Sequence, residues 1–102
     1  MKPGMEMAQS ELTRLLEAHE ATARLYVRAH GDHLILGRRE PWGPEGEMID
    51  DDRVRLTRLG GGAWGLSVRR HTGRWERTPF CGPMAEMVET ILGCMQHLVA
   101  PH

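Results

Sequence analysis

The chain has 102 residues, with 13 basic and 14 acidic side chains and a formal net charge of −1. This length supports one domain with its own hydrophobic core, and the balanced charge provides no overall field to attract nucleic acid or an anionic membrane. Apolar runs are far shorter than the ~20 residues that span a bilayer, and two cysteines are too few for a secreted disulfide scaffold, so we expect a single cytoplasmic domain, residues 1–102.

Residues 5–23 have the pattern of an amphipathic helix. Leu12, Leu15 and Leu16 recur at three- and four-residue steps, and charged residues occupy most positions between them. This periodicity predicts one helix whose apolar stripe faces the core.

Residues 24–40 predict a β-hairpin. Apolar and polar residues alternate from Leu25 to His30, Gly31-Asp32 suits a two-residue turn, and a second apolar run follows.

The next segment, residues 41–52, predicts an acidic surface loop because it contains two prolines and two glycines. Residues 40–52 carry six acidic side chains and no basic one, whereas residues 53–77 carry seven arginines and one glutamate. The two segments therefore have nearly cancelling charge.

Residues 53–79 predict a three-stranded meander, because alternating apolar and polar residues are interrupted by glycine turns at residues 60–62 and at Gly73. Residues 83–99 predict a second helix, with proline in its first turn and a broad apolar stripe.

These elements together predict an α+β fold, in which a five-stranded antiparallel sheet carries an N-terminal and a C-terminal helix on one face. The opposite sheet face is then left open and polar. Arginines and a tryptophan predicted as a binding surface on this open face are Arg53, Arg55, Arg69, Arg74, Trp75 and Arg77.

We expect a binding or interaction module rather than an enzyme, because no nucleophile, base and orienting group share a recognisable spacing. The arginines are suited to an anionic ligand or a protein partner. They also suit single-stranded nucleic acid, since guanidinium groups bind phosphates and aromatic rings stack on bases. The cancelling charge favours instead that the arginines pair with the acidic segment, including Glu45, Glu47 and residues 50–52.

A small enzyme is a further alternative. Cys81 precedes a helix and has His71 and His97 as possible bases, and Glu76 lies among arginines. A buried structural cysteine and a cross-strand ion pair of Glu76 with Arg69 or Arg74 explain these residues more simply. No histidine, cysteine or aspartate spacing matches a metal motif, so we expect no metal and no cofactor.

The apolar stripe of the last helix is wide enough to contact both the sheet and a partner. It contains Met84, Met87 and Met95, whose flexible side chains adapt to irregular surfaces. We expect a homodimer that uses these methionines, because two-fold dimers are the commonest soluble oligomers.

The string WGLSVRRHTGRWER, residues 64–77, resembles a segment of short single-domain bacterial proteins without an assigned activity. The likeness covers roughly the last half of the chain. It implies a bacterial, stand-alone domain and transfers no catalytic or binding residue.

Overall fold

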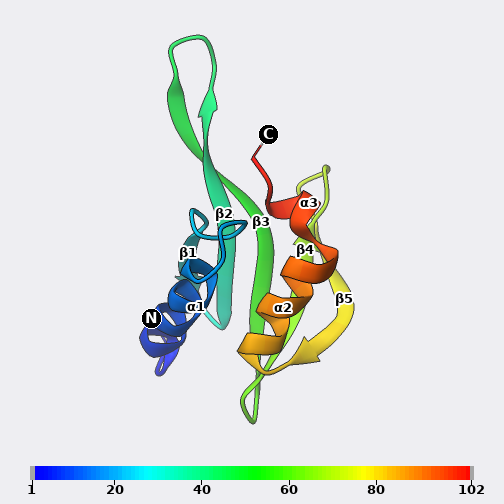
Figure 1. Cartoon of the computed structure of the whole chain (residues 1–102). Helices are drawn as coiled ribbons and strands as arrows, with labels where there is room; N and C mark the ends of the chain where they lie inside the picture. The colour runs from blue at the N-terminus through cyan, green and yellow to red at the C-terminus, as the bar shows by residue number, and fades with distance from the viewer. Residues whose placement is uncertain (1, 102) are drawn as a thin grey trace.

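The computed structural model describes residues 2–101, and it contains one helix, five strands and two further helices in chain order (Figure 1). These elements are α1 (Met5–Glu17), β1 (Tyr26–His30), β2 (His33–Trp42), β3 (Glu47–Gly60), β4 (Ala63–Arg69), β5 (Trp75–Gly82), α2 (Met84–Cys94) and α3 (Gln96–Val99). All neighbouring strands pair antiparallel in the order β1-β2-β3-β4-β5. The predicted α+β fold is confirmed.

The helices cover one face of this sheet. Helix α1 packs on β1, α2 packs on β4 and β5, and α3 packs on β3 (Figure 1). Leu12 and Leu16 of α1, Leu34 and Leu56 of the sheet, and Ile91 of α2 are buried in one continuous core. The apolar stripes of the two predicted helices thus meet the apolar positions of the strands. Within residues 2–101, no helix is long and apolar enough to cross a membrane.

Both predicted helices are shorter than expected. Helix α1 ends at Glu17, and residues 18–24 form successive turns. The buried hydroxyl of Thr22 donates to the carbonyl oxygen of Leu16 at 2.7 Å, which adds a second donor to the N–H of His19 at 3.3 Å and ties the turns to the helix end. The C-terminal helix is interrupted at Met95, directly after Gly93 and Cys94, and so divides into α2 and α3.

The predicted acidic loop, residues 41–52, is mostly strand. Residues 38–42 pair with residues 47–51, and a turn at residues 43–46 closes the hairpin. Gly43 and Gly46 have φ of 78° and 73°, conformations that other residues rarely adopt. Pro41 is tolerated because β2 has no partner on its other side beyond Gly37. The result is a two-stranded arm that projects past the helices (Figure 1).

A β-bulge in β3 changes which face Arg53 occupies. Leu36 pairs with Val54, but Gly37 pairs with Asp52, so Arg53 is the extra residue. Arg53 and Val54 are both buried, and Arg53 reaches the C-terminal residues on the helix side. The prediction that Arg53 belongs to the open face is wrong, because strict alternation fails at the bulge.

Candidate anion-binding pocket

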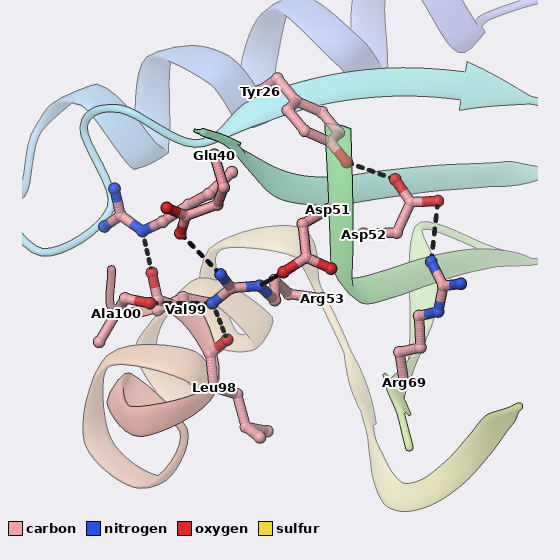
Figure 2. Close-up of polar contacts among 10 residues, drawn as sticks. Tyr26, Glu40, Asp51, Asp52, Arg53, Arg69, Leu98, Val99 and Ala100 are labelled. Atoms are coloured by element: carbon pink, nitrogen blue, oxygen red, sulfur yellow. Dashed lines mark hydrogen bonds and ion pairs between the residues drawn. The ribbon is translucent and has the colours of Figure 1, made fainter. Parts of the chain in front are cut away.

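The Arg53 guanidinium is held by hydrogen bonds to other residues of the protein (Figure 2). Its Nη1 donates to the carbonyl oxygens of Leu98 and Ala100, each at 2.9 Å. Its Nε donates to Asp51 at 2.8 Å and its Nη2 to Glu40 at 2.9 Å. Only 8% of Arg53 is exposed. This guanidinium therefore fixes the end of the chain against the sheet and is not available to a ligand.

Arg69, a second arginine of the predicted surface, forms an ion pair with Asp52. The Asp52 carboxylate accepts a hydrogen bond from Tyr26 and lies 3.6 Å from Arg69 Nη1 (Figure 2). It also accepts a hydrogen bond from Arg28 Nη2 at 2.6 Å. Burial opposes ionisation of this carboxyl, but the hydrogen bonds and the positive charges of Arg28 and Arg69 outweigh burial and lower its pKa. Asp52 thus neutralises the part of the open face that holds Arg28 and Arg69.

The acidic segment pairs with arginines only in part. Asp50 also forms an ion pair, with Arg39. Glu45 and Glu47 have no ion pair or hydrogen bond with any side chain in residues 2–101. The expected pairing is therefore present for Asp51 with Arg53 and for Asp52 with Arg69. Asp50 pairs instead with an arginine outside the predicted surface, and the two glutamates pair with no arginine of residues 2–101.

A pocket of about 220 Å³ lies on the part of the open face that holds Arg55 and Arg77, the two arginines that are not neutralised. Arg55 of β3 and Arg77 of β5 both pair with Ser67 of β4, so the three side chains form a row across the sheet. The residues that line the pocket are His33, Arg55, Thr57, Leu59, Gly65, Leu66, Ser67, Arg77, Thr78, Pro79, Phe80 and Cys81.

A second irregularity in the sheet opens this pocket. Between Gly65 and Ser67 the partner strand advances from Cys81 to Arg77, four residues against two. Pro79 lies in this bulge and has no N–H for the ladder. The Thr78 hydroxyl instead donates to the carbonyl oxygen of Leu66 at 2.8 Å. Because Gly65 carries no side chain, Leu59 lies over it, with Cδ1 3.4 Å from the place that a Cβ would take, and forms part of the pocket wall.

The pocket is positively charged and contains no counter-charge. Neither Arg55 nor Arg77 contacts a carboxylate of residues 2–101. The Arg55 Nε is buried without a hydrogen-bond partner, and the guanidinium carbon lies 4.9 Å from the centre of the Trp75 ring. Burial, and then the charge of Arg77, lower the pKa of Arg55. A buried guanidinium N–H without an acceptor is rare, and an ionised oxygen is its best partner.

His33 adds a group that can gain a proton. Its Nδ1 lies 2.8 Å from Thr57 Oγ1. Burial, followed by the charges of Arg55 and His30, lowers the pKa of His33 below its ordinary value. An anion in the pocket would offset the positive charge of Arg55, raise the pKa of His33 and so favour the protonated imidazole.

The sequence predicted part of this site. Arg55, Trp75 and Arg77 lie together on the open face as expected. Arg69 is paired with Asp52, and Arg74 is exposed in the turn before β5, outside the pocket. Alternation also predicts Thr57 and Ser67 on the open face, although they were not among the expected binding residues, and His33 and Thr78 were missed. These four polar residues complete the pocket. They come from four strands, and only the register of the sheet brings them together.

The enzyme alternative gains little from this geometry. Cys81 is exposed in the arginine pocket, whereas His71 and His97 line a different hollow. Glu76 forms its ion pair with Arg70 at 2.9 Å, and not with Arg69 or Arg74 as expected. Residues 2–101 contain no group of three or more side chains placed to hold a metal ion.

The methionines predicted for a dimer surface belong to the core. Met84, Met87 and Met95 are at most 6% exposed, because they pack between α2 and the sheet. This structure therefore does not offer them to a second copy, and that part of the sequence prediction is corrected.

A larger hollow, about 760 Å³, lies between residues 20–24 and residues 96–101. Its Arg38 already donates to the carbonyl oxygens of Ala21 and Val99, and alanines form much of its wall. Arg38 is therefore less available to a ligand than Arg55 is in the smaller pocket.

Comparison of the chain with protein-family models, with curated protein sequences and with solved structures found no match.

Proposed function

We propose that this protein is a small binding module that captures one anionic group, a phosphate or a carboxylate, between Arg55 and Arg77 on the open face of its sheet. The observation that carries the proposal is a pair of guanidinium groups beside Ser67 with no carboxylate partner, one of them with a buried Nε that lacks an acceptor. Guanidinium groups match the planar geometry of carboxylate and phosphate oxygens.

The size of the pocket supports recognition of a single group. Its volume of about 220 Å³ is below the ~300–1,000 Å³ of sites that enclose drug-sized ligands. The bound group is therefore the charged end of a larger ligand or a side chain of a protein. We propose binding rather than catalysis, because Cys81 has no hydrogen-bonded base within the part of the chain described. Two free cysteines fit a reducing, cytoplasmic setting.

Single-stranded nucleic acid remains the second candidate, since Trp75 and the arginines could together hold a base and a phosphate. The pairing of Arg28 and Arg69 with Asp52 argues against it. A nucleic acid backbone needs a row of free cations, and here the row is interrupted.

Isothermal titration calorimetry with sulfate, phosphate and acetate tests the proposal. We expect saturable binding that weakens by about tenfold or more in Arg55→Met and in Arg77→Met, the usual effect of losing a hydrogen bond to a charged group. Arg74→Met is the matched control, because Arg74 is exposed and lies outside the pocket. Absence of binding, or an equal loss in the control, would overturn the proposal.

A salt titration with a labelled oligonucleotide separates the two candidates. If only Arg55 and Arg77 engage phosphates, the logarithm of affinity should fall with the logarithm of salt with a slope no steeper than about −1.4. A slope steeper than about −3 would require four or more phosphate contacts and would support a nucleic-acid interface instead.

A further inference from the structure

The arm formed by residues 39–50 stands apart from the domain (Figure 1). Pairing with β1 ends at Gly37, and pairing with β4 begins at Val54, so neither outer edge of the arm has a neighbouring strand in residues 2–101. An isolated two-stranded hairpin is marginally stable in water. The arm therefore has the features of an element that is completed by a contact outside its own chain.

The surface of the arm is both apolar and acidic. Trp42 is 64% exposed, and Met48 and Ile49 are also exposed. Glu45 in the turn and Glu47 beside it are the two acidic residues that lack a partner within the described chain. Large exposed apolar side chains next to charged ones are typical of protein interaction sites.

The arginine pocket has the complementary surface. Arg55 and Arg77 supply positive charge without a carboxylate, and Leu59 and Phe80 supply exposed apolar side chains on the same pocket. Leu59 is 59% exposed. Within residues 2–101, Glu45 and Glu47 of the arm and Arg55 and Arg77 of the pocket thus lack a partner of opposite charge.

The arm cannot reach the pocket of its own chain. The tip lies at the Trp42 and Glu47 end of the β2–β3 pair, and the pocket lies at the His33 and Thr57 end. The ten residues of β2 from His33 to Trp42 make nine steps along the strand, so about 30 Å separates the tip from the pocket. A second copy with its strands antiparallel to the first places each tip beside the opposite pocket, which gives a closed two-fold arrangement.

We propose that the anionic group captured by the pocket is a carboxylate from the arm tip of a second copy, Glu45 or Glu47, and that the two copies exchange arms reciprocally in a homodimer. This inference rests on the proposed anion-binding function. The exposed apolar side chains of the arm then pack against Leu59 and Phe80 of the other copy.

Charge reversal tests the exchange by sedimentation equilibrium of the full chain. The arm variant carries Glu45→Lys and Glu47→Lys, and the pocket variant carries Arg55→Glu and Arg77→Glu. We expect the wild type to dimerise and each variant alone to dimerise at least tenfold more weakly. We expect an equimolar mixture to form a 1:1 heterodimer, because each arm then meets a pocket of opposite charge. The control carries Glu11→Lys and Glu17→Lys on the exposed side of α1 and should dimerise as the wild type does.

A monomeric wild type, unchanged dimerisation of the variants, or a mixture that stays monomeric would overturn the inference. Heterodimer formation itself shows that both variants fold. Sulfate titration of the arm variant, whose pocket is intact, separates the two proposals. Sulfate binding without dimerisation of the wild type refutes the arm exchange alone, and absence of sulfate binding refutes the anion site as well.

Discussion

Arg53 donates a hydrogen bond to the carbonyl oxygen of Leu98, 45 residues later in the chain, at 2.9 Å. The bulge that turns Arg53 towards the helices thus fastens the last helix to the centre of the sheet. Free carbonyl oxygens at a helix end are stabilised by a nearby cation. A single inserted residue in β3 therefore determines how the C-terminus packs.

Arg53→Met should lower the free energy of unfolding by about 3–5 kcal/mol, because it removes the four hydrogen bonds that a largely buried guanidinium donates to Asp51, Glu40, Leu98 and Ala100. Urea denaturation measures the loss. Arg39→Met is the control: Arg39 forms an exposed ion pair with Asp50, worth less than about 1 kcal/mol. Equal losses in the two variants would contradict a structural role for Arg53.

Gly37→Ala should destabilise the fold by about 3 kcal/mol or more. A Cβ at Gly37 would lie 2.2 Å from the backbone oxygen of Asp51 and 2.3 Å from the Tyr26 hydroxyl, so the strands would have to separate. Gly93→Ala is the opposite case, because a Cβ there meets nothing within 4 Å and the residue is helical. Thermal unfolding should show stabilisation by about 0.5–1 kcal/mol for Gly93→Ala. A tolerated Gly37→Ala would mean that the Tyr26 ring does not cover this position.

Asp52→Asn should lower stability at pH 7 by about 2 kcal/mol, since a buried acceptor of charged hydrogen bonds is lost. The folded-state pKa of Asp52 is lower than in the unfolded chain, where it is about 3.9. The ionised carboxylate therefore stabilises the fold above pH ~4, and this contribution disappears as pH falls through the folded-state pKa.

Chemical denaturation at several pH values checks this linkage. The wild type and Asp52→Asn should differ at pH 7 and converge as pH falls through the lowered folded-state pKa of Asp52. Asp50→Asn, which removes only an exposed ion pair, should differ from the wild type by less than about 1 kcal/mol at any pH. A constant gap for Asp52→Asn across the pH range would contradict the linkage.

Anion binding should strengthen as pH falls from 7 to 5.5. The pKa of His33 lies below its ordinary value of about 6.5 in the free protein. A bound anion raises that pKa, so binding takes up a proton. Sulfate is the probe, because it does not titrate in this range. We expect a several-fold gain in affinity that His33→Gln abolishes and His71→Gln, outside the pocket, leaves intact. A pH-independent affinity would remove His33 from the site.

Two periodicities in the sequence were sufficient to predict the fold class, because strands β1 to β5 and the two helical stripes follow them closely. They could not place Arg53, since alternation assumes that no residue is inserted. The prediction of a loop for residues 41–52 was also wrong. Prolines and acidic side chains are typical of loops, but here Gly43 and Gly46 close a hairpin. The wide apolar stripe of the last helix proved to be core, which no spacing distinguishes from an interface.

The candidate site was predictable only for residues that follow the alternation along their own strand. Arg55 and Arg77 follow the pattern of the open face. His33 and Cys81 enter the pocket through the register of β2 with β3 and the bulge around Pro79. These depend on long-range pairing, and no local signal in the sequence reports them.

The most direct test of the anion site is the NMR signal of the Arg55 Nε–H group during a sulfate titration of the variant with Glu45→Lys and Glu47→Lys, whose pocket is intact and is not filled by a second copy. This N–H is buried without an acceptor in the free protein, so we expect its proton resonance to move downfield saturably as an oxygen binds it. The Nε–H signal of Arg53, already bonded to Asp51, should stay unchanged. An Arg55 signal that does not respond while sulfate binds elsewhere would contradict the site.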